Sequence, residues 1–191
     1  MLNIAAGTSS YTINNSLRFR SSATAYLSRT PASSGNRQTW TWSAWIKLGN
    51  LDNACLFSGG TTSNTRLGLY KNSSGYLITD IDGTGTYQQS VAVYRDPSAW
   101  YHLVWKFDTT QATAADRSII YINGTAISLT QTRSFTQNTN YTINNNELQT
   151  IGVFSNSTTA YPFDGYVAEV NFIDGSAKTP SDFGETDSTT G

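Results

Sequence analysis

The sequence predicts an all-β protein, a two-sheet antiparallel jelly-roll sandwich, and three observations support this prediction. Roughly twelve short apolar segments follow one another, with turn residues every 8–12 positions between them. Most segments alternate apolar and polar residues, which is the period of a strand with one buried face. No stretch shows the apolar spacing of an amphipathic helix. At 191 residues the chain fits a single domain.

The first half of the chain is expected to contribute strands separated by polar turns. Residues 1–10 carry little pattern, and we expect an N-terminal tail or contact arm there. The sandwich is expected to span residues 11–176, and residues 177–191 form a C-terminal tail or a link to a further region of a longer chain. Strands are expected over residues 11–20, 25–27, 39–48, 51–60, 66–70, 76–81 and 87–94.

The strand over residues 39–48 holds three of the five tryptophans. Each aromatic ring brings roughly 150–250 Å² to bury, so a face rich in them needs a second sheet against it. Alternation places Trp40 and Trp42 on this buried face. Trp45 falls on the opposite face beside Ser43 and Lys47, where we expect it to reach a partner or lie against a loop.

The second half adds another dominant strand over residues 99–108. Its apolar face is expected to carry Tyr101, Leu103, Trp105 and Phe107. The dipeptide at positions 123–124, Asn-Gly, predicts a hairpin between residues 118–122 and 125–129. Residues 112–115 allow one helical turn, and residues 131–146 are a long loop or an edge.

The last two strands are expected over residues 148–154 and 163–174. In the final strand, alternation places four apolar residues on one face: Tyr166, Ala168, Val170 and Phe172.

Charge and hydropathy exclude two classes of partner. The formal net charge is −1 and only 13% of residues are charged, so neither nucleic acid nor an anionic membrane surface has electrostatic support. No apolar run approaches the ~18 residues of a membrane-spanning helix, and the N-terminus lacks the pattern of a signal peptide. Cys55 is the only cysteine, which rules out an intrachain disulfide. Its apolar neighbours predict a small buried side chain.

The carboxylates argue against an enzyme. Glycoside hydrolysis needs two carboxyl groups roughly 5–9 Å apart, yet Glu147 and Glu169 have no acidic partner two or four positions away. Glu185 has Asp187 two positions on, but both fall in the expected C-terminal tail, outside the predicted strands. Asp80 and Asp82 share a strand face but run into a turn. We therefore predict no catalytic residues.

His102 is the only histidine, so a histidine-based metal cluster is excluded and any Ser-His-Asp triad would depend on it. It alternates with Trp100 and Val104 in the predicted strand. We expect a packed, hydrogen-bonded structural residue.

Several segments, in this order, resemble the concanavalin A-like, laminin G-like superfamily. They are Ser16-Leu17-Arg18-Phe19, Tyr26-Leu27, Trp42-Ser43-Ala44-Trp45-Ile46-Lys47, Trp100-Tyr101-His102-Leu103-Val104, Tyr121-Ile122-Asn123-Gly124 and Phe163-Asp164-Gly165-Tyr166-Val167-Ala168-Glu169-Val170. The resemblance covers residues 11–172 and implies a two-sheet jelly-roll.

A narrower resemblance is to virion proteins of tailed bacteriophages. It is carried by residues 26–31 with 35–37, 94–102, 108–115 and 172–175. It implies a virion protein of the capsid or tail fibre, made in the bacterial host cytoplasm and placed on the virion surface. In such proteins this block lies near the N-terminus and the chain often continues.

Laminin G-like domains often hold calcium at a loop edge, which makes calcium the one cofactor to consider. Calcium takes 6–8 oxygen ligands. The run Asp80-Ile81-Asp82-Gly83 begins like a calcium loop but lacks the later acidic ligands. Asp80 and Asp82 are therefore weak calcium candidates.

A sugar site needs an aromatic face for stacking and a few amide or carboxylate groups for hydroxyls. The loops offer Tyr87, Tyr161, Asn156 and Asp82 as candidates. Partial packing against the core is the alternative interpretation of each tyrosine.

Three functional hypotheses remain. The first is a non-enzymatic virion protein that attaches to host surface glycans, and the second is a structural module that contacts only other virion subunits. The third, a glycan hydrolase, is disfavoured by the carboxylate spacing. Virion symmetry predicts a homo-oligomer, a trimer if the protein belongs to a fibre.

Overall fold

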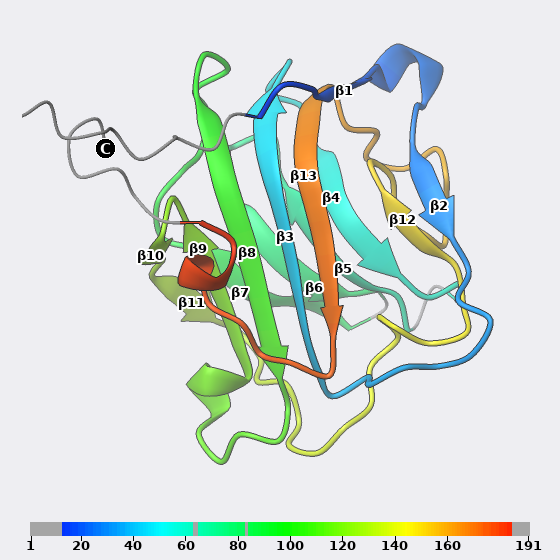
Figure 1. The fold of residues 1–191 in the computed structure, drawn as a ribbon, viewed down its shortest axis with the longest axis vertical. Coiled ribbons are helices and arrows are strands. Elements are labelled where there is room, and N and C mark those ends of the chain that lie inside the picture. The colour runs from blue at the N-terminus through cyan, green and yellow to red at the C-terminus, as the bar shows by residue number, and fades with distance from the viewer. Residues whose placement is uncertain (1–12, 63–64, 83, 185–191) are drawn as a thin grey trace, which may run out of the picture.

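A computed structural model describes residues 13–62, 65–82 and 84–184, and it confirms the two-sheet antiparallel sandwich (Figure 1). Sheet A contains, in spatial order, β1 (Leu17–Phe19), β13 (Gly165–Asp174), β3 (Thr39–Leu48), β8 (Trp100–Asp108), β9 (Ser118–Ile122) and β10 (Thr125–Ala126). Sheet B contains β11 (Leu129–Gln131), β7 (Gly85–Ser90), β6 (Leu77–Ile81), β5 (Leu67–Lys71), β4 (Ala54–Gly59), β12 (Gln149–Ile151) and β2 (Leu27–Arg29). Short 3₁₀ helices are η1 (Ser21–Ala23), η2 (Ala114–Arg117) and η3 (Pro180–Asp182).

The centre of the core lies where β3 and β8 pair, as the aromatic alternation predicted. Trp42 pairs with Trp105 in the antiparallel register, and both side chains are fully buried. Across the sandwich, the ring of Trp42 stacks on Phe57 of β4, with the ring centroids 5.3 Å apart. Trp40 stacks on Phe107 with a centroid separation of 4.7 Å. These rings hold the two sheets together and leave no room for a ligand between them.

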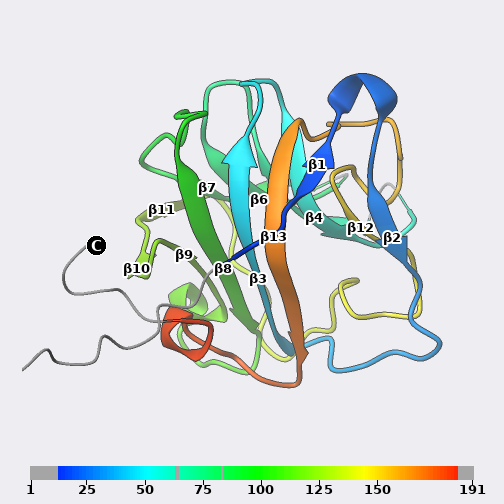
Figure 2. The same cartoon turned by 45° about the horizontal axis from the view of Figure 1, so that its top comes forward.

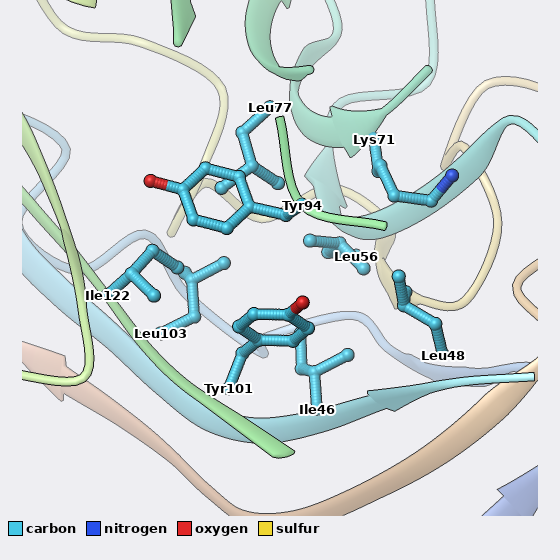
Figure 3. Close-up of a pocket in the computed structure, with 9 residues that line it drawn as sticks. All are labelled: Ile46, Leu48, Leu56, Lys71, Leu77, Tyr94, Tyr101, Leu103 and Ile122. Atoms are coloured by element: carbon cyan, nitrogen blue, oxygen red, sulfur yellow. The ribbon is translucent and has the colours of Figure 1, made fainter. Parts of the chain in front are cut away.

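A small gap between the sheets lies at one end of this core. Its volume is about 20 Å³, which is room for about one water molecule. Its lining is mainly apolar, and Tyr94 and Tyr101 meet edge to face beside it with centroids 5.8 Å apart (Figure 3). The aliphatic stem of Lys71 reaches the same gap. The gap is far too small for a sugar.

The outer face of sheet A is partly covered by the chain's own C-terminal segment. The hydroxyl of Thr41 donates to the carbonyl of Ser176 at 2.8 Å and accepts from the amide of Lys178 at 2.7 Å. Further along, Phe183 meets the edge of the His102 ring. This segment therefore buries polar strand residues that would otherwise face water.

His102 is packed and hydrogen-bonded, as predicted. Its Nε2 lies 3.0 Å from the hydroxyl of Ser43, and its ring stacks on Trp45 at 4.9 Å. Burial lowers the pKa of His102 below its usual value. Trp45 is thus half-buried against a histidine of its own sheet.

Two predicted strands differ from the structure because the chain changes direction. β7 ends at Ser90, whose hydroxyl accepts from the amide of Leu77 and donates to the carbonyl of Ala92. Val91 and Val93 therefore lie outside the strand and are 62% and 47% exposed, so the strand predicted over residues 87–94 extends too far. The strand predicted over residues 125–129 is divided between β10 of sheet A and β11 of sheet B.

The face predicted for the last strand is also wrong, because β13 contains a bulge. Tyr166 pairs with Lys47 on the outer face, whereas Val167 is buried beneath it. The register shifts between Ala168 and Asn171, and Glu169 adopts a left-handed φ of 48°. After the bulge Phe172 pairs with Trp42 on the inner face and stacks on Trp40, although it stays 37% exposed. One inserted residue moves the following side chains to the other face.

The other expectations concern the single cysteine, one helical turn, one short strand and the two ends of the chain. Cys55 is a buried free thiol, as predicted, and burial raises its pKa well above the usual value. Residues 112–115 overlap η2, whereas the predicted strand over residues 148–154 shortens to β12. The expected arm over residues 1–10 lies outside the described residues, and the proposed boundary at residue 177 stays a prediction. Within the described ranges, no helix is long and apolar enough to span a membrane.

Candidate functional site

An open depression with both polar and apolar surface lies at one end of the sandwich and has a volume of about 510 Å³. Four segments that are distant in sequence form it: η1, the loop before β4, the turn between β5 and β6, and the segment leading into β13. Figure 2 shows η1 beside the segment that enters β13. The lining residues are Ser21, Ser22, Asp52, Asn53, Ser73, Tyr161 and Pro162.

Tyr161 supplies the aromatic surface of this depression. Its ring lies against Tyr70 and Phe154, with centroid separations of 5.3 and 4.7 Å, and the residue is 36% exposed. Its carbonyl accepts a hydrogen bond from the amide of Cys55 at 2.8 Å. Its φ is 53°, a left-handed conformation that costs free energy for a tyrosine and persists because these contacts hold it. The ring is therefore fixed in place and partly open to solvent.

The polar walls of the depression are held by hydrogen bonds between loops. The side-chain oxygen of Asn53 accepts from the amide of Ser73 at 2.9 Å, which joins two opposite walls. The amide and hydroxyl of Ser21 donate to Asp164 at 3.1 and 3.2 Å. Burial alone would raise the pKa of Asp164, but hydrogen bonds from Arg18 and Ser21 lower it below the usual value. These contacts preorganise hydroxyl and amide groups around Tyr161.

Lys71 fixes two of the walls from beneath. Lys71 is only 1% exposed. Its ammonium group donates to the backbone carbonyls of Leu51, Asp52 and Asn72 at 3.0, 2.9 and 3.1 Å. Burial lowers the pKa of Lys71. Three charge-assisted hydrogen bonds thus tie the loop before β4 to the turn after β5.

Replacing Lys71 by methionine is expected to loosen both loops. Methionine keeps the apolar stem but leaves three carbonyls without their donor, which lowers the free energy of unfolding by about 1–3 kcal/mol. Amide hydrogen exchange of residues 51–53 and 72–73 is expected to accelerate. Lys47→Met, at a partly exposed position on sheet A, serves as the control and should change stability by less than about 0.5 kcal/mol. Unchanged exchange in both loops would contradict the clamping role.

A buried ion pair lies on the outer face of sheet B, under the segment that carries Tyr161. The guanidinium of Arg66 donates to both carboxylate oxygens of Asp80 at 3.0 and 2.7 Å. It also lies 3.7 Å from the ring centroid of Phe154. Burial raises the pKa of the Asp80 carboxyl, and Arg66 opposes that rise.

The structure brings four of the five predicted site residues into one region. The side-chain amide of Asn156 donates to Asp82 at 2.5 Å. Tyr161 connects to Asp80 through Phe154 and Arg66. The fifth candidate lies elsewhere: Tyr87 stacks on Phe135 at 4.8 Å, half-buried against the core, as the alternative interpretation proposed.

The residues around Asp80 do not suit calcium. Both carboxylate oxygens already accept from Arg66, and this guanidinium would repel a second cation. Among the described residues, no three His, Cys, Asp or Glu side chains gather into a metal-binding group.

Sequence reasoning found Tyr161 but missed the polar side chains opposite it, in η1, the loop before β4 and the β5–β6 turn. They come together only through tertiary packing, and no local pattern marks them. One signal was available in β5. Leu67, Leu69 and Lys71 share its inward face, and a lysine in such an apolar series requires buried acceptors.

A family model described as the concanavalin A-like lectin/glucanases superfamily matches residues 21–182. Among curated proteins, no sequence matches the chain significantly.

Three solved structures illustrate the similarity in fold. The CBM40 domain of the Ruminococcus gnavus IT-sialidase has 14% identity and a TM-score of 0.56, covering 82% of this chain and 95% of that one. Domain 4 of AbnA, a GH43 extracellular arabinanase from Geobacillus stearothermophilus, has 22% identity and a TM-score of 0.54, covering 78% and 65%. A heptameric SAP-like pentraxin from Limulus polyphemus has 16% identity and a TM-score of 0.53, covering 77% and 68%. At these identities the likeness concerns the fold alone.

Proposed function

The chain belongs to the concanavalin A-like lectin/glucanases superfamily, and from this premise we propose that it is a non-catalytic glycan-binding protein of a bacteriophage virion. Its sandwich is displayed on a capsid or tail fibre and attaches the particle to glycans of the host surface. The protein is made in the bacterial cytoplasm and its partners are glycans and other virion subunits.

The observation that carries the glycan-binding part is the depression beside Tyr161. It combines a fixed, partly exposed aromatic ring with hydroxyl, amide and carboxylate groups at a single open surface. Sugars stack their apolar faces on such rings and exchange hydrogen bonds with such groups. Two proteins of the same fold support this proposal through their ligands. One is the Ruminococcus domain bound to α2,3-sialyllactose, and the other is the arabinanase domain in complex with arabinotriose.

The non-catalytic part of the proposal follows from how the nearby carboxylates are engaged. Asp80 is held by Arg66 through two hydrogen bonds, and Asp82 accepts from Asn156. A glycosidase needs one carboxyl free to donate a proton and a second free to act as nucleophile or base. A carboxylate held by a guanidinium suits neither role.

Replacing Tyr161 by alanine is expected to weaken glycan binding about tenfold, which corresponds to about 1.4 kcal/mol. The measurement is a glycan array followed by isothermal titration calorimetry of the strongest ligand. Tyr166→Ala is the control, because Tyr166 is similarly exposed (39%) on the outer face of sheet A. Binding that depends on Tyr166 and not on Tyr161 would place the site on sheet A. Failure of the unmodified protein to bind any glycan would overturn the glycan-binding proposal.

The second candidate function is a structural module that contacts only other virion subunits. A row of three neighbouring side chains on the outer face of sheet A favours it. In this row Lys47 of β3 lies between Tyr166 of β13 and Trp100 of β8. These two aromatic residues are 39% and 36% exposed. Exposed apolar side chains grouped in this way are typical of protein–protein contacts.

The virion part of the proposal is supported by the sequence resemblance to tailed-phage proteins, and it has its own test. A reconstruction of the virion should place the domain on the particle surface, in contact with other subunits. Small-angle scattering should show a homo-oligomer, a trimer if the protein belongs to a fibre. A monomer at micromolar concentration together with isolated copies on the virion would overturn the trimer.

A further inference from the structure

Resting on the proposed function, we propose that the depression beside Tyr161 binds neutral sugars and rejects acidic ones, and that Asp52 determines this choice. The class of sugar that binds is set by the charged groups that a ligand meets, and the side chains that line the depression are the first of these.

Asp52 is the charged member of the lining, and it is exposed. The other lining residues carry hydroxyl, amide or aromatic groups, apart from Pro162. None of the described lining residues is lysine or arginine. The lining itself therefore offers one negative charge and no cation.

Two cations close to the depression, Lys71 and Arg18, are committed to other partners. The ammonium group of Lys71 lies below the depression, where it donates to three backbone carbonyls, and its residue is 1% exposed. Arg18 lies beside η1 and forms an ion pair with Asp164 at 2.8 Å. A bound sugar carboxylate would have to displace these hydrogen bonds to pair with either Lys71 or Arg18.

The chemistry of Asp52 suits uncharged polyols. An ionised carboxylate only accepts hydrogen bonds, and sugar hydroxyls donate them. Such charge-assisted bonds are stronger than neutral ones. Asn53, Ser73 and the serines of η1 both donate and accept, so they match hydroxyl groups in either direction. A sialic or uronic acid placed on Tyr161 would bring a second carboxylate towards Asp52.

The expected discrimination is at least fivefold in affinity. Two like charges 4 Å apart in water repel by an amount that corresponds to about this factor, and partial desolvation increases it. Because the effect is electrostatic and near the surface, raising the salt concentration from 0.05 to 1 M should reduce it.

The test compares paired oligosaccharides that differ by a single acidic sugar. The probes are lactose with 3′-sialyllactose, N-acetyllactosamine with its sialylated form, and cellobiose with cellobiouronic acid. A glycan array screens all pairs and calorimetry then measures those that bind. We expect the neutral member of each binding pair to be favoured at least fivefold, and Asp52→Asn to bring the ratio close to one by improving the acidic member.

Asp116→Asn is the matched control, since Asp116 is an exposed aspartate in η2, outside the depression. It should leave the ratio unchanged, and circular dichroism verifies that both variants fold. Equal or tighter binding of the acidic members, or a ratio that Asp52→Asn does not change, would overturn this inference and leave the proposed function standing. If no member of any pair binds and the wider array is also blank, the proposed function fails and this inference fails with it.

Discussion

Replacing Trp105 by alanine is expected to lower the free energy of unfolding by about 3–5 kcal/mol. The side chain is fully buried and its ring lies 4.9 Å from that of Trp40. Its Nε1 donates to Ser118 at 3.0 Å, and the Ser118 hydroxyl donates in turn to Gln88 at 2.7 Å. The substitution therefore removes a large apolar surface and leaves a cavity beside a buried polar network. Urea unfolding followed by circular dichroism measures the loss.

Trp100→Ala tests whether this loss comes from burial. Trp100 begins the same strand and has the same side chain, but it is 36% exposed. Its replacement is expected to cost less than about 1 kcal/mol. Similar losses in both variants would mean that burial does not distinguish the two rings. A loss below about 1 kcal/mol for Trp105 would contradict its place in the core.

The strands that sequence could locate are those with long, regular alternation. β3 occupies residues 39–48 as predicted, because Trp40, Trp42 and the other apolar residues on its inner face can be buried only in one register. β8 starts one residue later than predicted for the same reason. In such strands a shift by one residue would expose several large rings.

The errors fall where a single residue changes the geometry. The bulge at Glu169 has no sequence signal, because a non-glycine residue in the left-handed region gives no local warning. The separation of β10 from β11 is equally hidden, since Thr125 to Leu129 alternates well enough for one strand. β10 joins sheet A because Ala126 pairs with Tyr121, and β11 joins sheet B because Leu129 pairs with Ser90. These tertiary contacts decide which sheet each part joins.

The candidate site was predictable only in part. Of the residues chosen by type and loop position, Tyr161 lines the depression, whereas Asp82 and Asn156 bond to each other outside its lining. Asp52 and Ser73 could not be identified, because their role depends on a depression formed by four distant segments. Residue type locates a stacking ring, whereas the polar groups around it are defined by packing.

Asp80→Asn is the second change for which we expect a large effect, a loss of about 3 kcal/mol in the free energy of unfolding. Arg66 is 2% exposed, so its guanidinium would stay buried without the carboxylate that accepts two of its hydrogen bonds. Asparagine offers one acceptor oxygen where aspartate offers two, it places an NH2 donor in the other position, and it carries no charge. Residues 154–161 cover Arg66 through the ring of Phe154 and also carry Tyr161. Hydrogen exchange of the amides in this segment should therefore accelerate as stability is lost.

The double variant Arg66→Met with Asp80→Leu separates an unpaired charge from a loss of packing. Methionine and leucine fill part of the volume and leave no buried charge, so the double variant should be more stable than Asp80→Asn alone. The ring of Phe154, whose centroid lies 3.7 Å from Arg66, then packs on an apolar side chain in place of a cation. The single variants Arg66→Met and Asp80→Leu complete the comparison. If the double variant loses as much unfolding free energy as these two combined, the two residues act independently. The ion pair would then contribute nothing to the surface that supports Tyr161.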